Sequence, residues 1–278
     1  MTWLLYAIGA TILLAAAPVL AKAGAKKSDP ALSSAISGLA VLVMMFIQSP
    51  GSLSSFSFAS YGTRELICLL LSGITAGLAA YFFFMAIGNG ELINIAPVIR
   101  CSMVISLLAG FFLWDSKFTN MTIAKMILIV IGTVVMVAGG SGKNYKWLAH
   151  ALLAAVSISA SKLLMSYGFG GTTNNTNVIR CIIAIILLFG IGIGTGGIKK
   201  FKSITFLDGI LLVLAGLVSV FYKTISAKAA IITGWSNVEA VLRFELLAIV
   251  LLAGICLKEK MSGKSFIGAI VIIAALFL

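Results

Sequence analysis

Apolar runs follow one another along almost the whole chain, and they restrict its fold more than any other feature of the sequence. A helix needs roughly 20 mostly apolar residues to cross the hydrocarbon core of a membrane. Short stretches rich in Gly, Ser, Asn and Lys separate the runs, and none is long enough for a soluble domain. We predict ten membrane-spanning helices, at residues 2–21, 31–49, 65–88, 91–113, 121–140, 147–167, 176–196, 207–228, 233–257 and 264–278.

The composition supports this prediction, because 61% of the residues are hydrophobic and only 10% are charged. A soluble protein of this length does not need so large an apolar fraction. We therefore expect an all-α, multi-pass protein of a cell membrane, the inner or plasma membrane in a prokaryote. The first run ends in small residues as a signal peptide does, but no basic segment precedes it, so we interpret it as a span.

The sequence offers no motif for catalysis, metal binding or a cofactor. Its four cysteines, Cys68, Cys101, Cys181 and Cys256, are scattered without metal-ligand spacing, and His150 is the only histidine. There is no Gly-rich phosphate motif either. We therefore expect neither an enzyme nor a bound metal or cofactor. The net charge of +12 is spread over the flanks of the spans, which indicates contact with anionic lipid and not with nucleic acid.

The second half of the chain repeats the first. A shift of 143 residues places INIAPVIR on SNVEAVLR, so that Asn94 matches Asn237 and Arg100 matches Arg243. The same shift places the small-residue triplet LSG of the third predicted span on LAG of the eighth. A match at one offset across several spans indicates an internal repeat.

The repeat predicts how the chain is organised. With one more residue of shift, GFFLWD falls on GICLKE, and Asp115 matches Glu259. Residues 1–142 and 143–278 are therefore expected to be copies of one five-helix unit. Because five is odd, the second copy enters the membrane from the opposite side, which makes an inverted-topology repeat. Proteins of this kind usually bind their substrate near the membrane midplane, between the two halves.

The chain resembles EamA-type transporters of the drug/metabolite transporter superfamily. The resemblance covers essentially the whole chain and is carried by a Gly-rich third helix in each unit, the fourth-helix segment APVIRCSMVISLLAGFFLWD and a final helix after an acidic residue. LAKAGAKKSDPALSSAISGLAVL also resembles the linker and second helix of small single-repeat members, in which that helix often carries a basic residue. Here Ser37 occupies that place, while the second copy has Arg180 at the same offset. The resemblance implies a transporter, but not which substrate it moves.

Charged residues inside the predicted spans are the strongest functional signal. Each costs roughly 2.5 to 3.5 kcal/mol at the centre of a membrane helix, so a chain that keeps them usually uses them. Two are acidic and five are basic, which makes the interior net basic: Glu239, Glu245, Arg100, Lys162, Arg180, Lys223 and Arg243.

Helical spacing predicts how some of these charges pair. Glu239 and Arg243 are four residues apart, so we expect them to form an ion pair on one face of the ninth span. Glu245 points away from that face and would need Lys223 or Arg180 on a neighbouring span. Arg100 has no acidic residue at the pairing positions of its own helix, so its counter-charge must come from elsewhere, and a substrate could supply it.

These charges, with nearby polar residues, form our candidate site. A guanidinium group holds a carboxylate or phosphate with two hydrogen bonds, which favours a small anionic or zwitterionic metabolite moved by alternating access. We expect Pro97 to kink its helix and act as a hinge. The candidate substrate-binding residues are Arg100, Arg243, Glu239, Asn94, Asn237, Arg180, Lys223, Glu245 and Tyr81.

Each of these residues also has a purely structural interpretation. The charges could form a buried network that locks helix packing, and the asparagines could tie helices together. Tyr81 belongs to the aromatic run YFFF, whose members mostly face lipid or packed neighbours. A second functional class is also open, a flippase or an auxiliary membrane subunit for a lipid-linked substrate, for which relatives of the family are a precedent. The expected partners are a small molecule, membrane lipid and, as a further arrangement, a second copy of the chain.

The basic residues between spans predict an orientation. Eleven lysines follow odd-numbered spans, while the other side has four basic residues, namely Arg64, Lys117, Lys125 and Lys228. The side richer in Lys and Arg normally faces the cytoplasm, which puts both termini outside it. The family resemblance implies both termini inside, so the two arguments conflict, and we favour the charge count.

Overall fold

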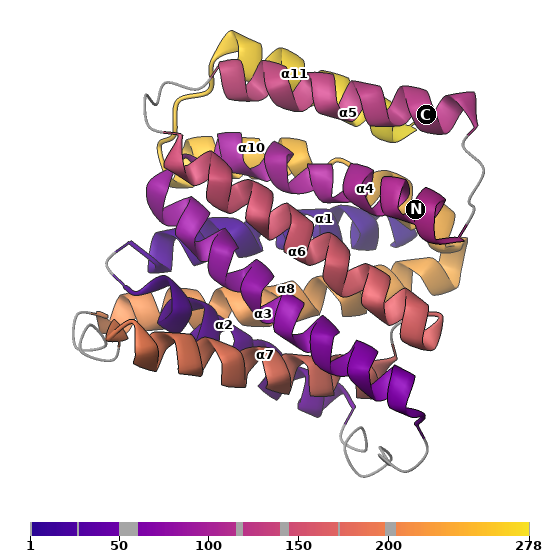
Figure 1. The fold of residues 1–278 in the computed structure, drawn as a ribbon. Coiled ribbons are helices and arrows are strands. Elements are labelled where there is room, and N and C mark those ends of the chain that lie inside the picture. Colours follow the sequence, from indigo (N-terminus) through magenta and orange to yellow (C-terminus); the bar gives the residue numbers. More distant parts are fainter. Residues whose placement is uncertain are drawn as a thin grey trace.

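A computed structural model describes residues 2–26, 28–49, 61–114, 119–139, 145–171, 173–197 and 204–277, and these form helices and short connections without any strand. Figure 1 shows the helices side by side along one direction, with both chain termini at the same end of the bundle. The helices are α1 (Thr2–Gly24), α2 (Pro30–Gln48), α3 (Thr63–Asn89), α4 (Leu92–Trp114), α5 (Asn120–Ala138), α6 (Lys146–Phe169), α7 (Asn174–Gly194), α8 (Phe206–Thr233), α9 (Trp235–Leu242), α10 (Glu245–Cys256) and α11 (Gly263–Phe277).

Most predicted spans coincide with one helix, but the ninth does not. The segment expected to be one helix over 233–257 is divided into α9 and α10 by a turn at Arg243 and Phe244. Eight helices, α1 to α8, are long and apolar enough to cross a membrane on their own. The helix α11 is apolar but has only 15 residues. Length and composition therefore identify a multi-pass membrane protein, and the expected count of ten spans depends on how α9, α10 and α11 are counted.

The helices of the two halves exchange partners in a regular way. The helix α3 packs on α6 and α7, and α8 packs on α1 and α2. In the same manner α4 packs on α6, while α9 and α10 pack on α1. The pairs α2 with α7 and α5 with α11 each join a helix to its own counterpart in the other half. Exchanging α1 to α5 with α6 to α11 thus reproduces the same packing, as expected for two copies of one unit.

Small residues allow the α5–α11 pair to approach closely. A Cβ atom added to Gly132 would lie 2.6 Å from Cγ1 of Ile272, and one added to Gly268 would lie 2.6 Å from the Gly132 carbonyl oxygen. Each glycine thus fits against the backbone or a side chain of the partner helix. Membrane helices associate through such small-residue contacts, because lipid provides no hydrophobic force between them.

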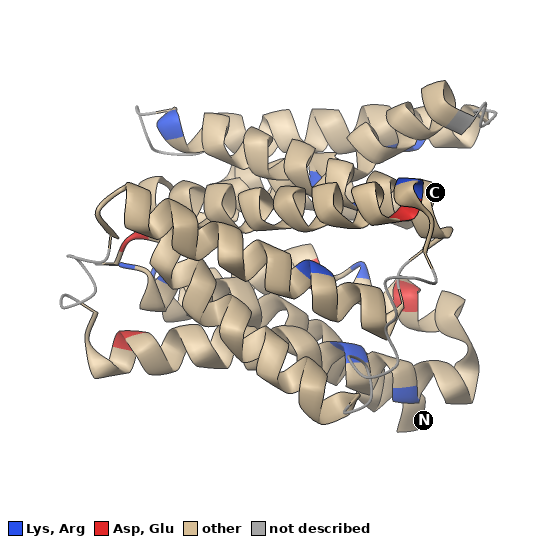
Figure 2. Cartoon of the chain, turned by 60° about the horizontal axis from the view of Figure 1, so that its bottom comes forward, with Lys and Arg blue, Asp and Glu red and all other residues tan. Residues whose placement is uncertain are grey.

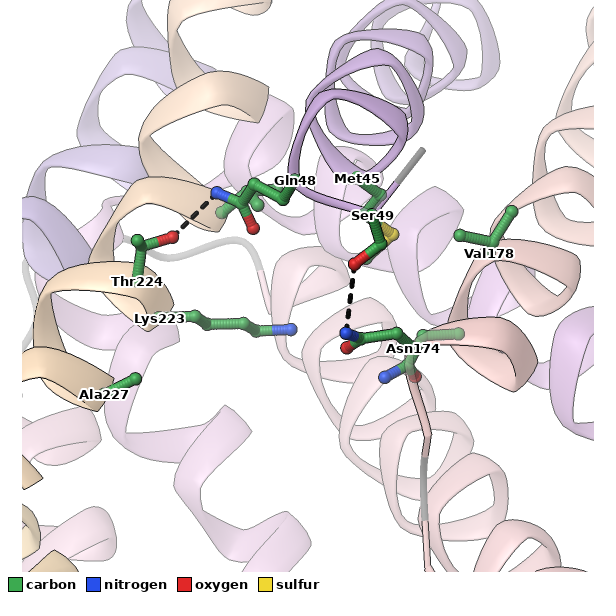
Figure 3. A pocket seen from close by; sticks show the side chains of 10 residues that line it. Met45, Gln48, Ser49, Asn174, Val178, Lys223, Thr224 and Ala227 are labelled. Carbon is green, nitrogen blue, oxygen red and sulfur yellow. Dashed lines mark hydrogen bonds between the residues drawn. The ribbon is translucent and has the colours of Figure 1, made fainter. Parts of the chain in front are cut away.

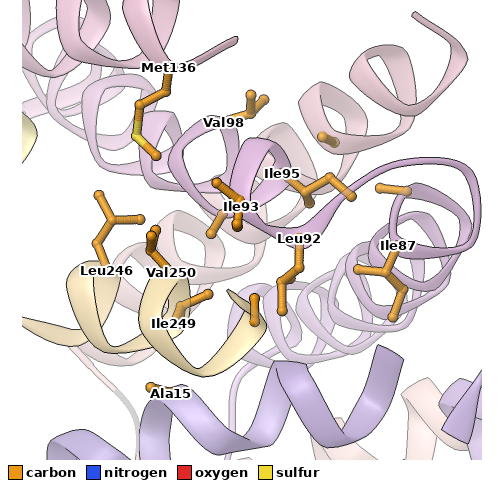
Figure 4. Packing of buried hydrophobic residues seen from close by; sticks show 14 of the residues in the cluster. Ala15, Ile87, Leu92, Ile93, Ile95, Val98, Met136, Leu246, Ile249 and Val250 are labelled. Atoms are coloured by element: carbon orange, nitrogen blue, oxygen red, sulfur yellow. The ribbon is translucent and has the colours of Figure 1, made fainter. Parts of the chain in front are cut away.

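The main core lies where α4 and α10 face each other. Ile93 and Val98 of α4 and Leu246 and Val250 of α10 are almost fully buried, and Met136 of α5 packs above them (Figure 4). Many large apolar side chains instead point outward, among them Leu5, Phe112, Phe206, Ile231 and Ile255. An apolar exterior of this extent suits a helix bundle surrounded by lipid.

The two ends of the bundle hold different segments of the chain. The terminal end holds both chain termini, the end of α2 and the start of α7 (Figure 1). The lysine-rich end holds Lys22 at the end of α1, together with the start of α4 and the segment after α10. The candidate site lies between these ends.

Candidate functional site

A cavity opens between α2, α7 and α8, with α3 behind it, and we call it the α2–α7–α8 cavity. It consists of an outer hollow of about 220 Å³ and an inner hollow of about 310 Å³, which share Met45, Asn177 and Lys223. Its lining includes Ser34, Ser37, Ala80, Asn177, Arg180 and Lys223.

The mouth of this cavity lies at the terminal end. There, Gln48 Nε2 donates a hydrogen bond to Thr224 Oγ1 at 2.7 Å, and Asn174 Nδ2 donates one to Ser49 Oγ at 3.1 Å (Figure 3). Gln48 and Asn174 are both exposed. These two side-chain hydrogen bonds join α2 to α8 and to the start of α7 at the rim of the outer hollow.

Two of the predicted site residues, Arg180 and Lys223, meet in this cavity. Arg180 Nη1 donates to Asn177 Oδ1 at 2.9 Å, and its Nη2 donates to Ser161 Oγ at 2.7 Å. The Nε atom of Arg180 is buried and has no hydrogen-bond partner. The Lys223 ammonium projects from α8 across the outer hollow (Figure 3). Within the described part of the chain, neither cation has a carboxylate within 4.0 Å.

The lining of the inner hollow follows the sequence repeat. Ser37 and Arg180 are 143 residues apart, and so are Ala80 and Lys223, yet all four line the same hollow. The hollow is thus built from matching positions of both copies, but both cations come from the second copy. The sequence indicated this asymmetry at Ser37 and Arg180, and it did not indicate that the two residues share one cavity.

A second cavity, of about 350 Å³, lies deeper between α1, α3, α4, α6, α8 and α10, and we call it the central cavity. Arg100 Nη2 forms an ion pair with Glu245 Oε2 inside it. Lys162 and Tyr222 also line it, and both interact electrostatically with Arg100. Charged residues are sparse along the helices of the bundle (Figure 2), so this cluster stands out.

The Arg100–Glu245 pair corrects two sequence-based expectations. Arg100 was expected to lack a counter-charge, and Glu245 was expected to pair with Lys223 or Arg180. Instead α4 and α10 pack together and bring Arg100 and Glu245 within contact. Spacing within a helix could not reveal this, because the two residues belong to different repeats.

The expected ion pair between Glu239 and Arg243 is also wrong. Glu239 is exposed on α9, and no salt bridge joins these two described residues. Arg243 lies at the turn between α9 and α10, where its Nη1 donates to the Leu276 carbonyl oxygen near the end of α11. Its guanidinium carbon lies 5.7 Å from the centre of the Phe277 ring. The last carbonyl oxygens of a helix receive no hydrogen bond from an N–H of the same helix, and a cationic side chain can donate to them.

The two candidate asparagines each form hydrogen bonds with a residue three or four positions earlier in the chain. Asn94 is buried near the start of α4, where its Nδ2 donates to Glu91 Oε2 at 3.0 Å. Asn237 is exposed, and its Nδ2 donates to the carbonyl and the hydroxyl oxygen of Thr233, both at 2.9 Å. Neither residue lines the two cavities. Their substrate-binding role remains a prediction.

Tyr81 and Pro97 also lie outside both cavities. The Tyr81 ring is tilted against Phe82, with 5.5 Å between the ring centres, whereas Phe83 lines the central cavity. Pro97 is buried within α4, which continues through it without a break. The counterpart of α4 in the second copy is the helix that is interrupted, at Arg243 and Phe244 between α9 and α10. The hinge role of Pro97 therefore remains a prediction without an observed break to support it.

At the lysine-rich end, a network that the sequence analysis missed joins the two halves of the chain. Lys22 Nζ lies 2.6 Å from Glu259 Oε1 and 2.5 Å from the Gly90 carbonyl oxygen. The same carboxylate accepts hydrogen bonds from the backbone N–H groups of Leu92 and Ile93, each at 3.0 Å. The side chains of Lys22 and Glu259 are only 17% and 7% exposed. Asp115, which matches Glu259 in the repeat, lies outside the described residues.

Glu259 thus caps α4, because its carboxylate satisfies two of the free N–H groups at the start of that helix. It also joins the segment after α10, in the second half, to α1 and α4 in the first. The sequence identifies Glu259 only as an acidic residue before the last predicted span. The partner could not be found from spacing along the chain.

Comparisons with known proteins agree with this architecture. A solved crystal structure matches 97% of this chain and 93% of its own length, with a TM-score of 0.62 and 17% sequence identity, which shows a shared fold. No curated protein matches the chain. The EamA-like transporter family model matches twice, at residues 1–138 and 145–278. The chain therefore belongs to the EamA-like transporter family.

Proposed function

We propose that this protein is a secondary transporter that moves a small anionic or zwitterionic metabolite across a cell membrane by alternating access. The α2–α7–α8 cavity carries the proposal, because it holds Arg180 and Lys223 and none of the described residues that line its hollows is acidic. Arg180 is half-buried and Lys223 is exposed, so water or a ligand must compensate the two cations. An anion bound between them would do so.

The proposed transporter has ten membrane helices in two inverted five-helix repeats. The exchange of packing partners between the halves supports two copies of one unit. In this arrangement α9 and α10 together form one interrupted span, and α11 forms the last. Interrupted helices in transporters commonly lie next to the substrate path, because their exposed backbone groups can bind ligands or ions.

Alternating access requires that one end of the bundle is closed while the other is open. The Lys22–Glu259 network joins the two halves at the lysine-rich end. At the terminal end, the α2–α7–α8 cavity reaches the exposed residues Gln48 and Asn174. This combination supports a structure open at the terminal end, in which the network must break before the opposite end can open.

A flippase for a lipid-linked substrate is the second candidate function, and a particular groove favours it. This groove of about 390 Å³ runs between α1 of the first half and α9 and α10 of the second. It is lined almost entirely by apolar side chains, namely Leu4, Ile8, Thr11, Ile12, Val241, Phe244, Leu247, Ala248 and Leu251. An acyl or isoprenoid chain would suit such a surface. The cations of the α2–α7–α8 cavity lie elsewhere, so we favour a soluble anion.

A ligand screen followed by transport assays tests the proposal. A ligand that binds only the folded protein raises its apparent stability, so soluble anions and zwitterions should raise the thermal unfolding temperature of the purified protein. The compounds that do so should then enter liposomes that contain the protein. Stabilisation by lipid-linked compounds alone, without uptake of any soluble anion, would favour the flippase instead.

A further inference from the structure

We infer that the substrate is a small dianion, such as a dicarboxylate or a phosphate monoester, held by Arg180 and Lys223 of the second repeat. This inference rests on the proposed function and names the substrate class. Two observations carry it, namely the charge balance of the α2–α7–α8 cavity and the incomplete hydrogen bonding of Arg180.

The charge balance favours two negative charges. Two cations line the inner hollow, and the described residues around it include no Asp or Glu. The central cavity differs, because Glu245 neutralises Arg100 there and leaves one cation, Lys162, among the described lining residues. A monoanion or a zwitterion in the α2–α7–α8 cavity would leave at least one cation uncompensated, whereas a dianion would balance both. Guanidinium and ammonium groups together are also a common pair of ligands for phosphate and carboxylate oxygens.

The geometry of Arg180 prepares it to receive an acceptor oxygen. Asn177 and Ser161 each hold one end of its guanidinium, so the group is fixed in place. Its Nε–H is buried without a partner, and a buried donor without an acceptor is unfavourable. A carboxylate or phosphate oxygen would satisfy this donor. Neither observation depends on which dianion is bound.

The size of the hollow limits the ligand to a small molecule. At about 310 Å³, the inner hollow lies at the lower end of the range for small-molecule sites, which is roughly 300 to 1,000 Å³. Apolar residues such as Phe84 and Leu188 form the rest of its wall. A compact dianion with a short carbon chain suits this combination better than a nucleotide or a lipid headgroup with its chains attached.

The repeat adds a mechanistic consequence. Ser37 and Ala80 occupy the positions of Arg180 and Lys223 in the first copy, so the first half contributes no charge to this hollow. The dianion would therefore stay with the second half while the first half moves against it. The matched positions also allow one cation to be transferred between the halves by mutation.

The first experiment measures the affinity of the purified protein for succinate, glycerol 3-phosphate and inorganic phosphate, with lactate and glycine betaine as monoanionic and zwitterionic controls. The dianions should bind about tenfold or more tightly than lactate, since one more charge-assisted hydrogen bond accounts for at least that factor. Succinate and glycerol 3-phosphate separate the dicarboxylate from the phosphate class. Arg180→Gln and Lys223→Gln should each weaken binding by roughly ten- to hundredfold.

A matched control separates local from general charge effects. Lys228 is an exposed lysine on the same helix as Lys223, and it lines neither hollow. Lys228→Gln should therefore leave the affinity unchanged. An equal loss in Lys223→Gln and Lys228→Gln would overturn the assignment of Lys223 to the site. Thermal unfolding without ligand shows whether each variant is folded.

The second experiment uses the repeat itself. Ser37→Arg combined with Arg180→Ser moves the guanidinium to the matching place in the first half. This double variant should regain part of the affinity that Arg180→Ser alone loses. The recovery should be incomplete, because Ser34 and Pro18 stand where Asn177 and Ser161 hold Arg180 in the second half. A folded double variant without any recovery would contradict the conclusion that positions 37 and 180 face the same bound dianion.

The outcomes distinguish this inference from the proposed function. Tight binding and uptake of lactate or glycine betaine, with no preference for dianions, would refute the dianion and leave the transporter intact. Binding of lipid-linked compounds alone would refute both. Binding of dianions that is insensitive to Arg180→Gln and Lys223→Gln would place the dianion elsewhere and refute this site.

Discussion

At the scale of single residues, the Arg100–Glu245 ion pair decides how the central cavity tolerates charge. Their side chains are 35% and 13% exposed, so each would be left partly buried and unpaired if the other were removed. Arg100→Met and Glu245→Met should therefore each lower the free energy of unfolding by about 1 to 3 kcal/mol. The double variant Arg100→Met/Glu245→Met should lose clearly less than the sum, because it leaves no charge behind.

Chemical unfolding of the four proteins in one detergent measures this coupling. Additive losses would show that the two residues do not interact in the folded protein. Arg243→Ala provides a comparison, since Arg243 binds the Leu276 carbonyl and forms no ion pair with a carboxylate of the described residues. It should remove one hydrogen bond without leaving a buried unpaired acid.

Part of this residue-scale arrangement could be predicted from the sequence. The cost of burying charge identified Arg100, Arg180, Lys223 and Glu245 as residues that must have a use. Their partners could not be predicted, because spacing rules compare positions within one helix, and Arg100 and Glu245 meet across the two halves. The same limit explains why Glu239 and Arg243, at ideal spacing, were expected to pair and do not.

At the scale of helices, the α5–α11 contact depends on two glycines. Gly132 and Gly268 lie so close to the partner helix that an added methyl group would collide with its backbone or with a core side chain. Gly132→Ala and Gly268→Ala should each destabilise the protein by about 1 to 3 kcal/mol, the usual cost of overpacking. Gly190→Ala is the control, since nothing lies within 4 Å of that site. It should be neutral or stabilising, because alanine favours a helix by about 1 kcal/mol.

Thermal unfolding of the three glycine variants tests this contact. Equal unfolding temperatures for Gly132→Ala, Gly268→Ala and Gly190→Ala would contradict the close approach of α5 and α11. A loss confined to Gly132 and Gly268 would agree with it.

The cap that Glu259 provides for α4 can be tested by hydrogen exchange. Without the carboxylate, the amides of Leu92 and Ile93 lose their acceptor. Glu259→Ala should accelerate exchange at these two amides by roughly fivefold, which corresponds to the ~1 kcal/mol of a typical cap. Lys260→Ala changes the neighbouring charge and should have no such effect. Unchanged exchange in Glu259→Ala would show that the lysine-rich end is held closed by other contacts.

Most helices could be predicted from the sequence, because a span of apolar residues has few alternatives to a helix in a membrane. The interruption at Arg243 and Phe244 could not. Hydropathy averages composition over a whole window, and the segment stays apolar overall although Arg243 and Glu245 flank Phe244. At this turn Arg243 contacts the end of α11, and only the folded chain brings the two segments near each other.

At the scale of the whole molecule, the distribution of basic residues predicts the orientation in the membrane. Among the described residues, Lys22, Lys26, Lys146, Lys258, Lys260 and Lys264 belong to the lysine-rich end, against Arg64, Lys125 and Lys228 at the terminal end. Lys27, Lys117, Lys143, Lys199, Lys200 and Lys202 lie outside the described residues. The positive-inside rule places the lysine-rich end in the cytoplasm and both termini outside it.

Reporter fusions in a bacterial host test this orientation. Alkaline phosphatase is active only outside the cytoplasm, so it should be active when fused to the C-terminus and inactive when fused after Lys260 in a truncated chain. A fluorescent protein that matures only in the cytoplasm should give the opposite pattern. The expected orientation would also place the mouth of the α2–α7–α8 cavity outside and the closed Lys22–Glu259 network inside. The reverse pattern would make the same structure open to the cytoplasm, so that Arg180 and Lys223 would take their dianion from inside the cell.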